Sequence, residues 1–541
     1  MSEPSQRSAT RSSQIRDYFP FSDRIRPAQE KALAVIQRAR DNSKKFVLLE
    51  LPTGTGKSAV AIAAAQWAST WGNGAYILSP QKTLTAQYMR DFASCGLVEL
   101  RGRASYPCRD FETDCEVGGS LRGKDATTCL SCPYKAAKDD FVANKMGVTN
   151  FDYFLAETLY SGQLPRRSML VIDEAHNLEQ KVLGFTDFEI FPSTLQRYSV
   201  AIPTFENGDV EGASEWIQNE MIPSVESFIS NIPEGDVDSS DSRREAENLL
   251  RRMRRFIGSD QQEWAFWSDG KTLVFRPLGA AKYAGDFLFA RADIVVIMSA
   301  TILDFNVFSR TLGLADQDCE CLAVPSDFPV KNRPIYYRPL GSMNFRNKGE
   351  TLPKIAEALD KLLRARPDRK GLIHTNSYEM NRILTKALAA AGHGGRIITH
   401  GPGGAEGAIE RHSMSRGPTV LCSPAMTEGI DLRDDLSRFQ VVVKIPYPNF
   451  KEPYVAARKQ LDGGWYPWQT AMRLIQATGR SVRSQTDFAE TYIVDSDFQQ
   501  FRRMSRHLLP GWWLDAVSES TERKPAASTG PTQMEQERKL F

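Results

Sequence analysis

The sequence predicts an α/β protein built on two parallel β-sheets, and two observations lead to this prediction. Short, β-rich apolar runs alternate with helical patterns, and each run ends at a polar motif. Strands that alternate with helices form parallel sheets whose two faces are both covered. The runs fall into two sets, at residues 46–51, 75–78, 169–172 and 294–298, and at residues 371–373, 419–422, 440–445 and 491–494.

Two stretches interrupt this alternation and predict insertions into the first lobe. Residues 103–148 contain four cysteines, and residues 178–270 show helical periodicity without sheet signals. We expect the polar ends of the chain to be disordered. The expected division is a first lobe at 1–102, 149–177 and 271–331, a cysteine-bearing insertion at 103–148, a helical insertion at 178–270, a second lobe at 332–517 and a tail at 518–541.

Charge and cysteine content narrow the class of protein. The 68 Lys and Arg residues nearly balance the 66 Asp and Glu residues, so contact with a polyanion would require local basic patches. Eight cysteines in 541 residues are too few for a secreted disulfide scaffold. No apolar run is long enough to cross a bilayer, and no secretory signal is visible. We therefore expect a cytoplasmic protein that does not associate with membranes.

A glycine loop carries the first chemical signal. Residues 51–58 read LPTGTGKS, between a predicted strand and an alanine-rich helix. In that setting backbone N–H groups wrap phosphate oxygens, Lys57 reaches the β- and γ-phosphates of a nucleotide, and Ser58 holds Mg²⁺. Leu51 stands where the strict motif has glycine, but the two later glycines make the turn. The expected phosphate ligands are Thr53, Gly54, Thr55, Gly56, Lys57 and Ser58.

An acidic motif follows the apolar run 169–172. Asp173 and Glu174 emerge where this strand stops. With a phosphate loop upstream, Asp173 is placed to bind Mg²⁺, and Glu174 to orient or deprotonate an attacking water. His176 in the same motif is either a hydrogen-bonded structural residue or a residue that couples this site to another.

A second-lobe helix ends in residues 476–483, which read QATGRSVR. Arg480 and Arg483 are three residues apart and lie on one face of a helix. A guanidinium supplied by another lobe stabilises the charge that develops on a γ-phosphate during transfer, although surface arginines are also common. We predict that Gln476, Arg480 and Arg483 complete a catalytic site.

The order of these motifs resembles that of the XPD/DinG-like branch of superfamily 2 iron–sulfur helicases, from Tyr18 to about Trp513. This family resemblance implies two RecA-like lobes, with an iron–sulfur insertion and a helical arch insertion in the first. It also implies that Gln29 lies on the adenine side of the nucleotide. Residues 495–498 lack the arginine that the family usually carries there. Further matching segments are 18–21 (YFPF), 26–29 (RPAQ), 83–87 (TLTAQ), 299–301 (SAT) and 423–431 (SPAMTEGID).

The same resemblance implies an ATP- and Mg²⁺-dependent DNA helicase that moves 5′ to 3′ on single-stranded DNA. Forked or hybrid duplexes are the expected substrates, and a monomer is the expected form. A rival interpretation is an ATP-switched nucleic-acid clamp that does not unwind duplexes. The basic stretch 242–255 is either a solvated charged face or a contact for a nucleic-acid backbone.

The resemblance also interprets four cysteines that are separated by six, thirteen and two residues: Cys108, Cys115, Cys129 and Cys132. One C-x-x-C pair instead of two, together with RGRASYPC at 101–108, resembles the approach to the family's [4Fe–4S] cluster. Four thiolates can also hold tetrahedral zinc, and unrelated buried thiols are a third alternative. The ungrouped cysteines are expected in hydrophobic cores: Cys95, Cys319, Cys321 and Cys422.

The tail ends on residues 536–541, which read QERKLF. Large apolar residues at the tip of a solvated tail bury nothing by themselves, so Leu540 and Phe541 could anchor in a partner's groove. This end loosely resembles bacterial sliding-clamp peptides, although the usual leucine after the glutamine is missing. The alternative is a free end without a function.

Overall fold

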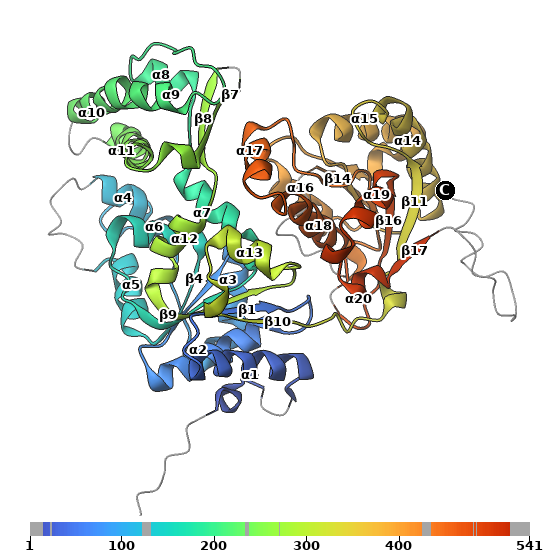
Figure 1. The fold of residues 1–541 in the computed structure, drawn as a ribbon, viewed down its shortest axis with the longest axis horizontal. Helices are drawn as coiled ribbons and strands as arrows, with labels where there is room; N and C mark the ends of the chain where they lie inside the picture. The colour runs from blue at the N-terminus through green and yellow to red at the C-terminus, as the bar shows by residue number, and fades with distance from the viewer. Residues whose placement is uncertain are drawn as a thin grey trace, which may run out of the picture. The chain divides into compact units, whose positions relative to one another are not determined.

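Two compact units make up the protein in the computed structural model. The structure describes residues 14–21, 24–121, 131–232, 237–269, 271–424, 434–479, 481–482 and 484–519. The first unit holds residues 14–51 and 55–323 together with Lys451–Leu461, and the second holds the remaining described residues. Each unit contains a seven-stranded parallel sheet (Figure 1), so the predicted α/β class with two parallel-sheet lobes is confirmed.

The first sheet has the strand order β10-β1-β9-β5-β2-β4-β3. Strands β1, β2, β4 and β5 are buried along their whole length and β9 at every residue but Asp293, as expected for a sheet covered on both faces. Because β9 lies between β1 and β5, the strand ends that precede the glycine loop, the acidic motif and the Ser-Ala-Thr motif are neighbours. The strands are β1 (Phe46–Glu50), β2 (Ala75–Ser79), β3 (Val98–Glu99), β4 (Met146–Asn150), β5 (Arg167–Ile172), β9 (Ala292–Ser299) and β10 (Cys319–Ala323).

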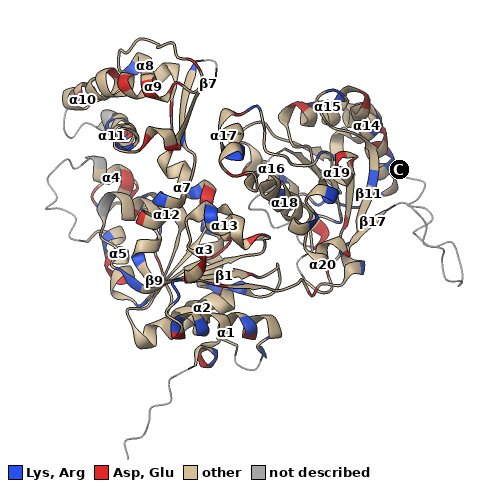
Figure 2. Ribbon diagram, viewed as in Figure 1, with Lys and Arg blue, Asp and Glu red and all other residues tan. Residues whose placement is uncertain are grey.

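Helices of the first unit place the site on this sheet. Helix α2 (Lys57–Trp71) follows the glycine loop, and its alanines are buried on almost all sides. Alanine suits this position because it favours helices and allows close packing. Basic and acidic residues both occur along α1 (Pro27–Asp41), as the blue and red parts of its ribbon show (Figure 2). The other helices packed in this unit include α3 (Lys82–Phe92), α4 (Cys115–Leu121), α5 (Pro133–Ala143), α6 (Phe151–Ala156), α12 (Ala281–Phe287) and α13 (Phe305–Leu312).

The second sheet has the order β13-β14-β12-β15-β16-β11-β17. Successive strand residues point to opposite faces: Ile373 packs in the core with α14 and α15, whereas Leu372 packs with Ala408 of α16. The strands are β11 (Ile335–Gly341), β12 (Gly371–His374), β13 (Ile397–Ile398), β14 (Val420–Ser423), β15 (Phe439–Val442), β16 (Glu490–Asp495) and β17 (Val517–Glu519). The helices are α14 (Lys348–Ala365), α15 (Tyr378–Leu388), α16 (Ala405–Met414), α18 (Trp465–Thr478), α19 (Asp497–Met504) and α20 (Gly511–Leu514).

The expectation of a purely helical segment at 178–270 is wrong. A three-stranded antiparallel sheet, β6-β8-β7, lies among the helices. Phe188 and Phe275 stack across β6 and β8 with ring centroids 4.6 Å apart, a pairing of distant segments that local periodicity does not reveal. The elements are α7 (Leu178–Thr186), β6 (Phe188–Ile190), α8 (Pro192–Arg197), α9 (Val210–Trp216), α10 (Ile222–Asn231), α11 (Val237–Ile257), β7 (Trp264–Asp269) and β8 (Thr272–Pro277).

Helix α17 (Pro453–Leu461) departs from the expected division, because it groups with the first unit although residues 332–517 were expected to form the second lobe. Arg458 of α17 forms a buried ion pair with Glu179 of α7, with 2.7 Å between Nη2 and Oε1. Arg276 of β8 lies 3.3 Å from Glu452, just before α17. Long-range charge pairs of this kind leave no local sequence pattern.

The ungrouped cysteines are only partly where they were expected. Cys422 is buried in the second unit, and Cys95 and Cys319 are half-buried. Cys321 is exposed, which corrects the prediction of a core position, because β10 is an edge strand with little cover. Among the described helices, none is long and apolar enough to cross a membrane.

Candidate functional site

The glycine loop adopts a backbone that requires glycine at two positions. Gly54 and Gly56 have φ angles of 84° and 81°, in the left-handed region that is strained for other residues. A Cβ atom added at Gly56 would also lie 2.4 Å from Nε2 of Gln29. Gly56 caps α2, so Lys57 and Ser58 occupy the first turn of that helix. This is the strand-loop-helix arrangement in which free N–H groups bind phosphate.

Gln29 braces this loop from α1. Its Nε2 donates a hydrogen bond to the Thr55 carbonyl oxygen at 2.9 Å, and its Oε1 accepts one from the Arg26 N–H at 2.9 Å. The side chain is buried. The structure therefore assigns Gln29 a role in holding the loop, while the contact with adenine stays a prediction.

Lys57 extends from the loop to the acidic motif. Its Nζ lies 3.3 Å from Oε1 of Glu174 and 3.4 Å from the Leu51 carbonyl oxygen. The side chain of Lys57 is 10% exposed and that of Glu174 is 26% exposed, so the pair is largely shielded from solvent but remains accessible to a ligand. A bound phosphate would compete with Glu174 for the ammonium group.

Asp173 is a buried carboxylate at the end of β5. Its Oδ2 accepts a hydrogen bond from the Tyr88 hydroxyl at 2.8 Å, and its Oδ1 accepts one from the Glu174 N–H at 2.9 Å. Burial, and then the neighbouring Glu174, raise the pKa of Asp173, whereas Lys57 and Tyr88 oppose this shift. A buried carboxylate fixed by two hydrogen bonds is a suitable ligand for the water shell of Mg²⁺.

Glu174 and His176 link the acidic motif to the Ser-Ala-Thr motif. Glu174 has a φ angle of 50°, an uncommon conformation outside glycine that aims its side chain at Lys57. His176 Nδ1 lies 3.1 Å from Oγ of Ser299 and 3.4 Å from Oε2 of Glu174. Ser299 Oγ also accepts a hydrogen bond from the Thr301 N–H at 3.2 Å. His176 is therefore hydrogen-bonded, and the bond joins two motifs that are far apart in the sequence.

Two residues of this site were missed by the sequence interpretation. Tyr88 follows the TLTAQ segment and holds Asp173. Glu50 ends the apolar strand β1, and its buried carboxylate accepts hydrogen bonds from the Ile302 and Leu303 N–H groups, the former at 2.6 Å. The only local signal for Glu50 is a charge at the end of an apolar run, and Tyr88 gives none.

The second-lobe residues are only partly within the described structure. Gln476 lies in the last turn of α18 and is half-buried. Arg480 and Arg483 lie outside the described residues, as do residues 425–431 of the SPAMTEGID segment. Their predicted catalytic roles stay predictions.

Three of the four grouped cysteines are described, and Cys129 lies outside the described residues. Cys115 Sγ and Cys132 Sγ are 3.7 Å apart. Cys115 is the first residue of α4, and Cys108 Sγ packs against Gly118 of the same helix, 2.5 Å from the position that a Cβ atom on Gly118 would take. Burial, and then Cys132, raise the pKa of Cys115 to about 11.

These thiols suit a soft metal. Four thiolates at about 2.3 Å from one zinc ion would be about 3.8 Å apart, close to the observed separation, and a [4Fe–4S] cluster also takes four thiolates. Among the described side chains, no group of three or more that could hold a metal ion is found. The identity of the metal centre therefore stays a prediction.

The arginines of the basic stretch on α11 form hydrogen bonds and ion pairs in the structure, although Arg254 is 60% exposed, and a contact with nucleic acid stays a prediction. These arginines bind within the inserted segments: Arg252 donates to the Asp187 carbonyl oxygen at 2.7 Å, and Arg254 pairs with Glu226. Arg244 pairs with Glu116 of α4, which joins the helical insertion to the cysteine-bearing insertion. The apolar side of the same helix is packed inward, with Met253 and Phe256 fully buried.

Two family models match the chain: Helicase C-terminal domain at residues 359–515, and Type III restriction enzyme, res subunit, at residues 22–199. ATP-dependent DNA helicase YoaA of Haemophilus influenzae is 25% identical over 266 residues, which are 46% of this chain and 41% of that protein. ATP-dependent DNA helicase DDX11 of Mus musculus is 31% identical over 115 residues, 19% of this chain and 12% of that protein. The matched segment thus spans about two fifths of the first relative and less of the second.

Solved structures share the fold. The structure named XPD_Helicase aligns with a TM-score of 0.65 at 17% identity, over 92% of this chain and 100% of that chain. Xpd4 of S. tokodaii aligns with a TM-score of 0.59 at 15% identity, over 92% of this chain and 100% of that chain. Together with the family models, these matches confirm the resemblance that the motifs indicate, to the XPD/DinG-like branch of superfamily 2 helicases.

Proposed function

We propose that the protein is an ATP-dependent DNA helicase that moves along single-stranded DNA. The observation that carries this proposal is the contact of Lys57 with Glu174 beside the buried Asp173, because these groups serve the phosphates, the water and the metal in nucleotide hydrolysis. The matched relatives are named as ATP-dependent DNA helicases, which supports DNA as the substrate.

Each residue has a distinct role in this proposal. The loop N–H groups and Lys57 would bind the phosphates, and Ser58 and Asp173 would hold Mg²⁺, which would supply positive charge to neutralise the transferred phosphoryl group. Glu174 accepts the proton of the attacking water. His176 couples the nucleotide site to the Ser-Ala-Thr motif through its hydrogen bond with Ser299.

Two variants test the hydrolytic site. Lys57→Ala removes the phosphate-binding cation, and Glu174→Gln keeps the shape of the side chain but cannot accept a proton. Both should abolish ATP hydrolysis that single-stranded DNA stimulates in the parent protein. A Glu174→Gln variant that turns over ATP like the parent would show that another group is the base.

Arg480 tests the contribution of the second lobe. Arg480→Ala should slow hydrolysis by a factor on the order of 10³ and leave nucleotide binding intact, because an arginine finger stabilises charge that develops only during transfer of the γ-phosphoryl group. Loss of ATP binding in this variant would instead place Arg480 among the ground-state contacts. Arg483→Ala is expected to behave in the same way.

A clamp that uses ATP without unwinding DNA is the second candidate, because the family match alone does not distinguish it from a helicase. Unwinding of a forked duplex, compared with hydrolysis of ATP, separates the two. A helicase of this branch should open forks and DNA–RNA hybrids that carry a 5′ tail. Unwinding only from a 3′ tail would contradict the proposed direction, and hydrolysis without any unwinding would favour the clamp.

We further propose that Cys108, Cys115, Cys129 and Cys132 hold a [4Fe–4S] cluster that aids strand separation. Protein purified without oxygen should then contain iron and acid-labile sulfide, and Cys108→Ser should lose both and lose unwinding more than ATP hydrolysis. Stoichiometric zinc without sulfide would refute the cluster and favour the tetrahedral site.

Two proposals concern partners. A sliding clamp would bind the chain end 536–541 through Leu540 and Phe541, which lie outside the described residues. A labelled peptide of the last ten residues should bind a bacterial clamp at micromolar concentration, and the doubly substituted Leu540→Ala, Phe541→Ala peptide should not. Equal binding by both peptides would end this idea. A monomer is the proposed active form, which light scattering of the active protein tests.

A further inference from the structure

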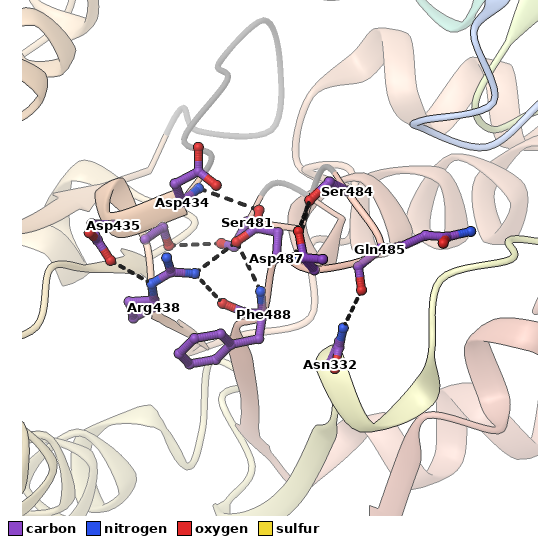
Figure 3. Close-up of polar contacts among 11 residues, drawn as sticks. Asn332, Asp434, Asp435, Arg438, Ser481, Ser484, Gln485, Asp487 and Phe488 are labelled. Carbon is purple, nitrogen blue, oxygen red and sulfur yellow. Dashed lines mark hydrogen bonds and ion pairs between the residues drawn. The ribbon is translucent and has the colours of Figure 1, made fainter.

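A cluster of polar side chains in the second unit joins two chain segments next to the predicted arginine motif (Figure 3). We name it the Asp487 cluster. It comprises Asp434, Ser437, Arg438, Ser481 and Asp487. One segment begins at Asp434, directly after residues 425–433, and the other contains Ser481, which stands between Arg480 and Arg483 in the sequence.

Asp487 is the centre of this cluster, and its side chain is 0% exposed. Its Oδ1 accepts hydrogen bonds from Nη1 of Arg438 at 2.7 Å and from the Phe488 N–H at 2.9 Å. Its Oδ2 accepts one from the Asp434 N–H at 3.4 Å. Both oxygens therefore bind the segment that begins at Asp434, Oδ1 through Arg438 and Oδ2 through the Asp434 N–H, and burial makes each bond costly to lose.

A second bond joins the same two segments. Ser481 and Ser437 are fully buried, and the Ser481 hydroxyl donates to Oγ of Ser437 at 2.8 Å. The Asp487 N–H also donates to Oγ of Ser484 at 3.1 Å. The second segment is thus tied to the first at Ser481 and at Asp487, and Ser484 binds Asp487 within the second segment.

We propose that Asp487 and Arg438 are positioning residues for ATP hydrolysis: they fix the segment that carries the predicted arginines. This inference rests on the proposed function. A guanidinium that acts on a developing charge must be placed accurately, because a displacement of about 1 Å can cost on the order of 10²-fold in rate. Neither Asp487 nor Arg438 needs to touch the nucleotide for this role.

The chain offers a matched control for a test. Arg438 also binds Asp435, with 2.9 Å between Nε and Oδ1, but the Asp435 side chain is 96% exposed and lies on one segment with Arg438. Asp487→Asn and Asp435→Asn each neutralise one carboxylate that pairs with Arg438. Asp487→Asn should lower kcat for ATP by about 10- to 100-fold with KM and nucleotide binding near those of the parent, whereas Asp435→Asn should match the parent in all three.

A double-variant cycle separates positioning from general loss of structure. If Asp487 acts through the arginine segment, Asp487→Asn should add little to the defect of Arg480→Ala. If Asp487 only stabilises the fold, it should lower the folded fraction and reduce activity by the same factor in both backgrounds. That result, or equal kcat values for Asp487→Asn and Asp435→Asn, would overturn the inference.

Ser437→Ala keeps the inference testable if Asp487→Asn folds poorly. It removes the buried bond to Ser481 at 2.8 Å and a longer bond to the Phe439 carbonyl oxygen at 3.4 Å, and should reduce kcat several-fold without changing the melting temperature by more than a few degrees. An unchanged kcat in a well-folded Ser437→Ala protein counts against the inference. A parent protein that binds DNA but does not hydrolyse ATP would refute the proposed function itself, and the inference with it.

Discussion

Replacing Tyr88 by phenylalanine removes one hydroxyl group from the buried centre of the nucleotide site. The ring stays, so packing against Phe92 is kept, with ring centroids 6.2 Å apart. The lost group is the donor of the 2.8 Å hydrogen bond to Oδ2 of Asp173. The Glu174 N–H still binds the other carboxylate oxygen, so Asp173 is held at one oxygen instead of two.

The size of the effect follows from the burial and charge of this pair. A hydrogen bond to a charged group contributes about 1.5–3 kcal/mol. If this whole free energy were lost from the binding of Mg²⁺, the Mg²⁺ concentration needed for half-maximal hydrolysis would rise by about 10- to 100-fold. Part of the loss will appear as lower stability, so we expect a rise of about 10-fold with a lower melting temperature.

The assay is ATP hydrolysis during a titration with Mg²⁺, at fixed free ATP. Tyr76→Phe is the matched control, because Tyr76 is buried in the same unit and its hydroxyl donates to the neutral Pro165 carbonyl oxygen at 3.0 Å. Tyr76→Phe should lower stability without changing the Mg²⁺ requirement. If Tyr88→Phe and Tyr76→Phe both show the requirement of the parent, Tyr88 does not position the metal ligand.

Three further predictions concern the stability of the fold and the shape of the loop. Glu179→Gln removes the charge that pairs with the buried Arg458 of α17 and should destabilise α7 and α17 by about 3–5 kcal/mol. Faster amide hydrogen exchange in these two helices would measure this loss. The control, Asp293→Asn, breaks the exposed ion pair with Arg166 and should cost under about 1 kcal/mol. Burial lowers the pKa of His412, so the unfolded chain takes up its proton first and the second unit should lose stability as the pH falls through about 6.5. The drop in melting temperature from pH 8 to pH 5.5 should be smaller in His412→Gln, and an equal drop would contradict this reasoning. Gly56→Ala should abolish nucleotide binding, because the added Cβ would meet Gln29. Gly96 has the same φ of 81° but no atom within 4 Å of an added Cβ, so Gly96→Ala should cost only about 1–2 kcal/mol of stability. Nucleotide binding retained in Gly56→Ala would refute the steric argument.

Much of the site could be predicted from the sequence because its signals are local. The glycine loop places Gly54, Gly56 and Lys57 within four residues, between a strand and a helix, and the observed φ angles follow from that arrangement. Asp173 and Glu174 end an apolar run, so their place at the end of β5 was also predictable. Parallel sheets follow from the alternation of strands and helices, which is likewise a property of neighbouring residues.

The tertiary structure decided the contacts between residues that are far apart in the sequence. Tyr88 and Asp173 are 85 positions apart, and Glu50 and Ile302 are 252 positions apart. The three-stranded sheet, the grouping of α17 with the first unit and the Asp487 cluster belong to the same class. A hydrogen bond or ion pair between distant residues depends on where the whole chain brings their side chains, and residue type and periodicity carry no record of that distance.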